Sequence, residues 1–283
     1  MPAVFVLIWS TGFVVARYGM PHAPPLGFLT LRYALSVIAF AIWIALTRAA
    51  WPRGRSQWLH LAATGALIHA GYLAGVWMAV KAGIGAGTVA LVVGLQPVLT
   101  ALWLSATGSK HAVAAQQWAG LLLGLAGLLL VVSLKLGVGE VNAVNLSLAV
   151  LALFAITAGT LYQKRFVAPC DVRTANMVQL VAALLLTAPF GWFEGGGWDW
   201  HAELIGALAW SVLVLTLGGS SLLYLLIQRG AATRVASLMY LVPPTTAVMA
   251  ALLFDEALSA RVLAGLALSA AGVWLVVQRR AAQ

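Results

Sequence analysis

Long apolar segments follow one another along the chain, separated by short clusters of charged residues, glycine and proline. This pattern predicts helices over residues 3–19, 26–47, 57–81, 84–104, 115–134, 144–165, 172–193, 203–229, 231–254 and 260–278. A helix that crosses a bilayer needs about 20 apolar residues, and these segments approach or exceed that length. The sequence therefore predicts an all-α membrane protein with ten transmembrane helices.

The breaks between the segments have physical causes. Residues 21–25 read PHAPP, in which proline removes backbone donors, and residues 52–56 read PRGRS, which are charged and disfavour a helix. The first 16 residues carry no charge, lack the basic start of a signal peptide and precede no small-residue cleavage site. We therefore expect them to form the first membrane-spanning helix.

Composition supports lipid as the main solvent. Apolar residues make up 63% of the chain and charged residues only 8%, whereas a soluble domain is about 25% charged. The net charge of +9 comes from basic residues in short connections, which indicates contacts with lipid headgroups and no nucleic-acid partner. Cys170 is the single cysteine, and we expect it to be inert.

The positions of Lys and Arg predict the orientation of the helices. If the N-terminus is cytoplasmic, most basic residues fall in cytoplasmic connections, among them 48–56, 164–173 and 229–234. Every acid except Asp171 falls on the opposite side. Because cytoplasmic connections carry an excess of Lys and Arg, we expect both termini in the cytoplasm.

The two halves of the chain share a pattern. Residues 88–104 resemble residues 234–250, which places Pro97 over Pro243. Two glycine pairs have the same spacing, Gly120–Gly127 and Gly265–Gly272. Chance alignment of small residues is the alternative, but the loop charges are also opposite in the two halves. We expect two five-helix units, residues 1–140 and 141–283, with the second inverted and the substrate site between them.

Several motifs resemble those of a known family. They are WSTGF at 9–13, PPLGFLTLRY at 24–33, GLQPVL at 94–99, ASLMYLVPP at 236–244 and FDEALSARVLAGLALSAAG at 254–272. The chain resembles the ten-helix EamA branch of the drug/metabolite transporter superfamily over essentially its whole length. It is most similar to the bacterial amino-acid exporters, including the aromatic amino-acid group. The resemblance implies a multi-pass protein of the bacterial cytoplasmic (inner) membrane.

The sequence departs from this family at one acidic position. Members often have Glu just after the ninth helix and again after the fourth. Glu256 matches the first position, whereas residues 106–112 after the fourth helix contain no acid. This difference puts in question any role that needs both carboxylates.

No pattern in the sequence indicates an enzyme or a cofactor site. The chain has no HExxH, Walker A or GxSxG motif and no paired acids within a predicted helix. We therefore expect no catalytic activity, no metal ion and no cofactor.

His69 is the ionisable residue nearest the middle of a predicted helix, and Tyr72 shares its face three residues on. Ionisable groups at that depth are costly and usually face a cavity. A neutral histidine that joins two helices by a hydrogen bond is an equal alternative. Without another titratable group at this depth, we expect the substrate to move down its own gradient without proton coupling.

Other polar positions predict the substrate pathway. The eighth helix carries Thr216, Ser220, Tyr224 and Gln228 at intervals of four residues. The fourth and ninth helices add Gln96, Ser237 and Tyr240. The candidate pathway residues are therefore His69, Tyr72, Gln96, Ser220, Tyr224, Ser237 and Tyr240. Close packing of helices explains the serines equally well, whereas a tyrosine hydroxyl needs a polar partner.

Three basic residues lie near the predicted outer ends of helices: Arg17, Arg32 and Lys81. Arg32 matches an arginine of the family motif in the second helix. These side chains could attract a carboxylate at the outer mouth of the pathway. Extension of the side chains toward lipid headgroups explains them equally well.

Together these features predict a membrane transporter that exports small organic solutes by alternating access through a central cavity. The expected solutes are amino acids, apolar and aromatic ones included, and related metabolites. We expect helices three, four, eight and nine to form a neutral cavity, and the turns at 82–87 and 229–233 to close its ends. A passive channel, an intramembrane enzyme or scaffold, and a nucleotide-sugar or drug carrier of the same superfamily are the alternatives. The partners are the bilayer and a small-molecule substrate, and the oligomeric state stays open.

Overall fold

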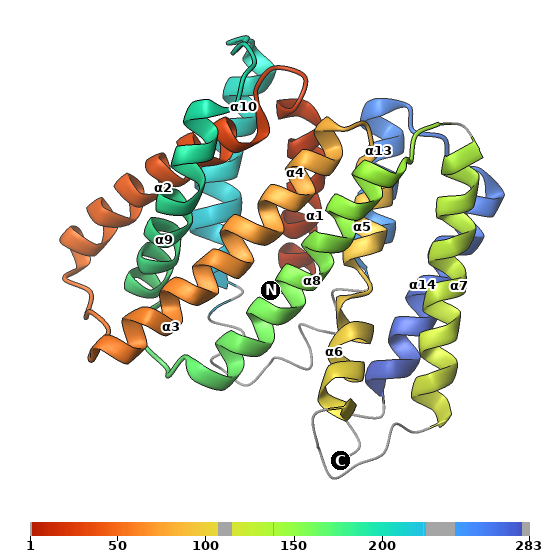
Figure 1. Cartoon of the computed structure of the whole chain (residues 1–283), viewed down its shortest axis with the longest axis horizontal. Coiled ribbons are helices and arrows are strands. Elements are labelled where there is room, and N and C mark those ends of the chain that lie inside the picture. The colour runs from red at the N-terminus through yellow and green to blue at the C-terminus, as the bar shows by residue number, and fades with distance from the viewer. Residues whose placement is uncertain (1, 107–114, 138, 223, 225–240, 279–283) are drawn as a thin grey trace.

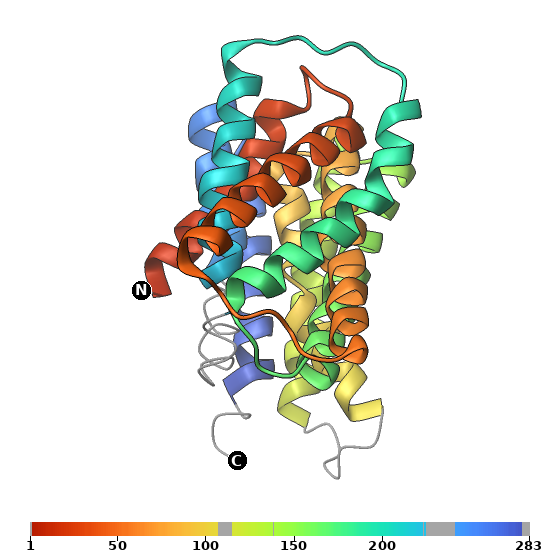
Figure 2. The ribbon, with the colours of Figure 1, turned by 90° about the vertical axis from the view of Figure 1, so that its left-hand side faces the viewer.

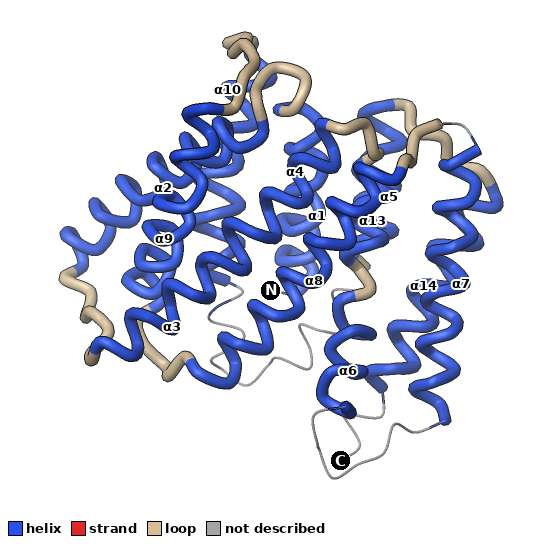
Figure 3. Tube along the Cα trace, in the orientation of Figure 1, coloured by secondary structure: helices blue, strands red, loops and turns tan. Residues whose placement is uncertain are grey.

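A computed structural model describes residues 2–106, 115–137, 139–222, 224 and 241–278 (Figure 1). Within these ranges the regular elements are helices, and no strand occurs (Figure 3). The predicted all-α fold is therefore confirmed for the described part of the chain.

The first half of the chain contains a long helix with a change of winding. α1 covers Pro2–Gly19 and α2 covers Pro25–Thr47. The next helix is unbroken through α3 (Arg55–Gly65), the π-helical segment η1 (Ala66–Leu73) and α4 (Ala74–Lys81). α5 (Ala86–Val93), α6 (Gln96–Ala106) and α7 (Ala115–Gly137) follow.

The second half has a similar succession. α8 covers Ala143–Phe166 and α9 covers Val172–Phe193. α10 (Ala202–Trp210) continues directly into a second π-helical segment, η2 (Ser211–Ser220). The last helices are α13 (Val242–Phe254) and α14 (Ala260–Gln278). The predicted turn at 229–233 lies outside the described residues.

Length and hydropathy identify the segments that can cross a membrane. Within the described ranges six helices are long and apolar enough: Pro25–Thr47, Arg55–Lys81, Trp118–Gly137, Ala143–Phe166, Val172–Phe193 and Ala202–Ser220. Four shorter apolar helices accompany them. Large apolar side chains also face outward, such as Leu185 at 69% and Phe190 at 66% exposure. An exposed apolar surface of this kind requires lipid or another apolar partner.

Residues 84–104 do not form the continuous helix that the sequence predicted. α5 ends at Val93, and Gly94 and Leu95 form a turn before α6. Pro97 has no N–H to donate to the carbonyl of Val93, which weakens the helix at this point. A Cβ on Gly94 would lie only 2.5 Å from Cγ of Pro243. The interruption therefore lies where α5 meets the start of α13.

α7 and α14 lie side by side and approach each other through glycine (Figure 1). A Cβ added to Gly127 would lie 2.4 Å from the carbonyl oxygen of Gly265. One added to Gly272 would lie 2.4 Å from the backbone nitrogen of Gly124. Only glycine permits backbones to come this close. The carbonyl oxygen of Gly120 lies 2.5 Å from the same Cβ on Gly272, so all four glycines of the aligned sequence pattern lie at this contact.

The connections predicted to lie outside the cell gather at one end of the bundle. There the Lys81 ammonium donates to the carbonyl oxygen of Met20 at 2.6 Å. The backbone N–H of Ala86 donates to the Glu256 carboxylate at 3.0 Å. Figure 2 shows the connection between α9 and α10 crossing the same end. These contacts tie segments from both halves of the chain together.

Candidate substrate cavity

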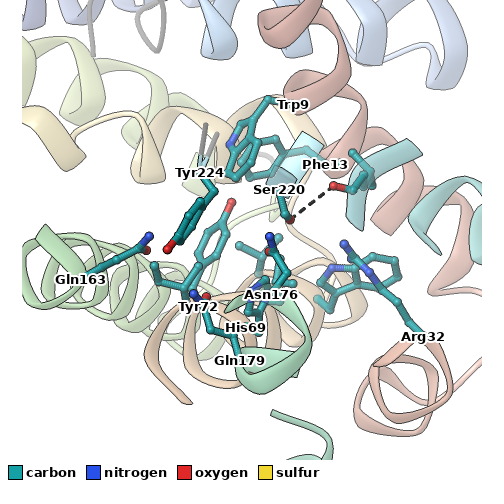
Figure 4. A pocket seen from close by; sticks show the side chains of 16 residues that line it. Trp9, Phe13, Arg32, His69, Tyr72, Gln163, Asn176, Gln179, Ser220 and Tyr224 are labelled. Carbon is teal, nitrogen blue, oxygen red and sulfur yellow. Dashed lines mark hydrogen bonds between the residues drawn. The ribbon is translucent and has the colours of Figure 1, made fainter. Parts of the chain in front are cut away.

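A cavity lies between helices from both halves of the chain. It contains about 770 Å³ of empty space, part of which is open to solvent. The residues that line it, drawn in Figure 4, are Trp9, Gly12, Phe13, Arg32, Ile68, His69, Tyr72, Leu73, Val76, Trp77, Gln163, Asn176, Gln179, Leu215, Ser220 and Tyr224.

The helices that line the cavity differ from those expected. α1, α2 and the η1–α4 helix contribute from the first half, and α8, α9 and η2 from the second. The prediction that the fourth helix lines the cavity is wrong for this pocket, because none of its lining residues belongs to α5 or α6. α5 instead packs against α13, where Gly94 lies close to Pro243.

His69 and Tyr72 both line the cavity from η1. His69 is 6% exposed, and its backbone carbonyl accepts a hydrogen bond from the Tyr33 hydroxyl at 2.6 Å. One residue thus joins neighbouring helices through its backbone and faces the cavity through its ring. π-helical segments alter the winding locally and occur frequently at functional sites.

Ser220 and Tyr224 line the cavity from the opposite half. The Ser220 hydroxyl donates to the carbonyl of Leu215 at 3.4 Å, as the dashed line in Figure 4 marks. Tyr224 is 5% exposed and its hydroxyl lies 3.1 Å from the Cys170 sulfur. Gln228 of the same predicted stripe lies outside the described residues.

The remaining candidates lie elsewhere. The Gln96 amide donates to the Thr160 hydroxyl at 3.1 Å, and Gln96 does not line this pocket. Ser237 and Tyr240 lie outside the described residues.

Arg32 is the largest departure from the expected site. The sequence suggested the outer mouth or the lipid headgroups for this side chain, and a neutral cavity. In the structure Arg32 is 5% exposed and lines the cavity. Its guanidinium lies 6.0 Å from the centre of the Trp77 ring. The prediction of a neutral lining is therefore wrong.

Amide side chains from the second half were also missed. Gln163, Asn176 and Gln179 line the cavity from α8 and α9. The amide nitrogen of Gln179 is buried without a hydrogen-bond partner among the described residues. In the sequence, the sign of these cavity positions was an amide side chain within an otherwise apolar helix.

A second polar cluster lies at the end where the connections predicted to face outward meet. Nδ1 of His22 lies 2.9 Å from an Asp199 oxygen, and Nε2 lies 2.9 Å from a Glu203 oxygen. Hydrogen bonds to Glu203 and Asp199 raise the pKa of His22 above its ordinary value. His22, His201 and Glu203 could together hold a metal ion, since their ligand atoms lie within 4.8 Å of one another.

Two carboxylates meet at the start of α5. Glu256 accepts from the Ala86 N–H at 3.0 Å, and Glu140 accepts from the Gly85 N–H at 3.1 Å. Burial raises the pKa of Glu256, and the hydrogen bond from Ala86 opposes that shift. Glu140 thus places a second acid beside Glu256, although the segment after the fourth helix has none.

Comparison with known proteins identifies the family. The sequence model of the EamA-like transporter family matches residues 3–133 and 144–278. The uncharacterized transporter YvbV of Bacillus subtilis is 27% identical and covers 99% of this chain and 92% of its own length. A probable amino-acid metabolite efflux pump of Salmonella typhimurium is 27% identical and covers 96% of this chain and 92% of its own length.

A solved crystal structure has the same fold. It is 20% identical, covers 100% of this chain and 97% of its own, and superposes with a TM-score of 0.71. The relatives above are named as an uncharacterized transporter and a probable efflux pump. The family resemblance predicted from the sequence is confirmed. Because the family model matches nearly all of the chain in two successive stretches, this multi-pass membrane protein belongs to the EamA-like transporter family.

Proposed function

We propose that the protein exports amino acids and related small metabolites from the bacterial cytoplasm through the cavity described above. This proposal rests on which helices supply the residues that line the cavity. The first three helices of residues 1–140 and the first three of residues 141–283 surround one space. A site between two repeats is typical of transporters that work by alternating access. The name of the Salmonella relative supports metabolites of amino acids as the cargo.

Helix packing supports two five-helix repeats of opposite orientation. α2 packs on α9, α5 on α13, and α7 on α14, so each pair joins elements of the same rank in the two halves. The two π-helical segments also occupy the same rank, the third helix of each half. Ten transmembrane helices then follow, when the interrupted α5–α6 pair counts as one.

Orientation follows from the basic residues. In our proposal both termini and residues 48–56 face the cytoplasm, and residues 194–201 face outward. The polar contacts among the outer connections hold that side together. Export requires these contacts to separate while the two halves move relative to each other.

Energy coupling is the remaining part of the proposal. Proton-driven carriers place titratable groups within the membrane. All seven acids of the chain lie in the described residues, and none of them lines the cavity. His69 is neutral in our proposal and acts as a hydrogen-bonding group. The substrate therefore moves down its own electrochemical gradient.

Counterflow in liposomes tests the proposed function. Purified protein is reconstituted with a high internal concentration of one unlabelled compound, and entry of the same labelled compound is followed. The panel covers apolar, aromatic, polar and charged amino acids and their deaminated derivatives. We expect saturable exchange of some of these compounds, and none in protein-free liposomes. Exchange of no compound in the panel would refute the proposal.

A further inference from the structure

Arg32 is placed where a membrane protein rarely leaves an unpaired charge. It lies seven residues after Pro25, about 10 Å along α2 at 1.5 Å per residue. The side chain is 5% exposed and faces the cavity (Figure 4). A charged group at such depth is costly, and it usually pairs with another group or marks a substrate pathway.

Among the described residues, hydrogen bonds satisfy only part of the Arg32 guanidinium. Nε and one terminal nitrogen of Arg32 donate to the same Thr216 hydroxyl oxygen, at 3.2 and 3.1 Å. Arginine has five N–H donors, so one hydroxyl oxygen leaves most of them available. No ion pair of Arg32 occurs among the described residues.

No acidic side chain of this chain is left to neutralise Arg32. All seven acids are described, and they lie in connections or at helix ends: Glu140, Asp171, Glu194, Asp199, Glu203, Asp255 and Glu256. The segments outside the described residues contain no Asp or Glu. The counter-charge must therefore come from a molecule that enters the cavity.

We propose that the cavity selects organic monocarboxylates with an apolar or aromatic body, and that Arg32 binds their carboxylate. This inference rests on the proposed transport function and narrows its substrate class. Guanidinium and carboxylate match in planar, two-bond geometry. Trp9, Phe13 and Trp77 provide an aromatic wall for the body of the substrate. The amide nitrogen of Gln179 is a further donor without a partner among the described residues.

The absence of an acid in the described lining also predicts how an amino group affects binding. An α-ammonium group finds only neutral acceptors in the cavity and is repelled by Arg32. A carboxylate without an ammonium group, as in a deaminated or N-acylated amino acid, therefore binds more tightly than the parent zwitterion. A compound with an ammonium group and no carboxylate binds most weakly.

Four compounds with one phenyl body separate these effects. They are 3-phenylpropionate, L-phenylalanine, 3-phenylpropanamide and L-phenylalaninamide, which combine the presence and absence of a carboxylate and an ammonium group. Dissociation constants are measured from the concentration dependence of the thermal unfolding midpoint of the full-length protein in detergent. Wild type is compared with Arg32→Gln and Arg32→Lys. Arg261→Gln is the control, because Arg261 is exposed and does not line the cavity.

In wild type and Arg261→Gln we expect 3-phenylpropionate to bind most tightly and its amide at least about tenfold more weakly, as for a hydrogen bond to a charged group. Arg32→Gln removes this preference, and Arg32→Lys retains part of it. If Arg32→Gln does not fold, Arg32→Lys and Thr216→Val replace it in the test. Both variants are then expected to prefer the carboxylate over the amide less strongly than wild type does.

Three results would overturn the inference: binding of none of the four compounds, equal binding of acid and amide by wild type, or the same preference in Arg32→Gln. The proposed function fails differently, through the absence of counterflow with every compound of the panel. If the protein exchanges amino acids in counterflow but its affinities do not change when Arg32 is substituted, the proposed function is retained and the proposed substrate class is refuted.

Discussion

His22 links the two halves of the chain through a charge that depends on pH. Both ring nitrogens contact carboxylates, one of Asp199 and one of Glu203. The ring also stacks on that of His201, with 5.2 Å between the centres. A doubly hydrogen-bonded ring of this kind is held as the imidazolium, since both nitrogens then donate.

We predict that this cluster stabilises the protein more at pH 6 than at pH 8. Because the pKa of His22 is raised above 6.5 in the folded protein, its contribution is fully present below about 6.5. The contribution is lost as pH rises through the raised pKa. Thermal unfolding midpoints in detergent should show a fall between pH 6 and 8 that is smaller in His22→Gln. An identical fall in both proteins would contradict the prediction.

Some residues that line the cavity were predictable from the sequence, and others were not. His69 and Tyr72 were found because polar groups in a long apolar segment are costly. Arg32 was noticed, but its distance from the helix end allowed either the outer mouth or the headgroups. Only the packing of α2 against η2 places the guanidinium on Thr216 and inside the cavity. The burial of a long side chain depends on the neighbouring helix, which sequence spacing does not specify.

Among the helices, the two π-helical segments change which side chains share a face. The sequence assigned Thr216 and Ser220 to one face of a regular α-helix. In the structure Thr216 donates back to the carbonyl of Ser211, five residues earlier, and Ser220 to that of Leu215. This spacing belongs to the wider π turn. Local propensity gives no sign of such a segment, because tertiary packing decides it.

The contact between α7 and α14 leads to a prediction for helix packing. Gly272→Ala places a Cβ 2.4 Å from the Gly124 backbone nitrogen and 2.5 Å from the Gly120 oxygen. Backbone atoms cannot move away as a flexible side chain can, so the two helices must separate. We expect this to lower the free energy of unfolding by about 1–3 kcal/mol. Thermal unfolding in detergent should show a lower midpoint for this variant.

Gly206 in α10 is the matched control for this substitution. A Cβ on Gly206 has no neighbouring atom within 4 Å, and the residue is exposed. Gly206→Ala should therefore leave the midpoint unchanged or raise it, since alanine favours a helix by about 1 kcal/mol over glycine. Equal effects of the two substitutions would mean that α7 and α14 do not approach as described.

At the scale of the whole molecule, orientation is the first quantity to test. Ser56 lies exposed near the start of α3, and Gly197 lies exposed between α9 and α10, where a Cβ meets no atom within 4 Å. In a Cys170→Ser background, Gly197→Cys should react with a membrane-impermeant maleimide in intact cells. Ser56→Cys should react only after the cells are opened. Reaction of both from the same side would overturn the proposed orientation and the inverted repeats.

Proton coupling is the second prediction for the whole molecule. With the membrane voltage clamped to zero, an imposed pH gradient should not drive a counterflow substrate above its external concentration in liposomes. The reason is the cavity lining, which holds no carboxylate among the described residues. Accumulation that protons drive, and that His69→Gln abolishes, would instead identify His69 as a proton relay.

The whole fold was more predictable than the site. Apolar segment lengths and their breaks predicted most of the described helices, because lipid requires long apolar segments, whereas the interruption within residues 84–104 was not predicted. The glycine spacing predicted an internal repeat, but it did not predict that Gly127, Gly265 and Gly272 bring α7 and α14 into contact. The choice of helices that line the cavity was not predictable in this way. That choice depends on which face of each amphipathic helix finds a partner, and polar residues occur on packed faces as well.

The position of Arg32 bears on how export is driven. A carboxylate that leaves a bacterial cell moves out of a compartment with a negative electrical potential. Each elementary charge that crosses 100 mV releases about 2.3 kcal/mol, equivalent to a concentration ratio of about 50 at equilibrium. A carrier that takes monocarboxylates on a single guanidinium therefore expels them against a considerable gradient without any coupling ion. The electrical potential that powers other transporters in the same membrane then acts directly on the cargo.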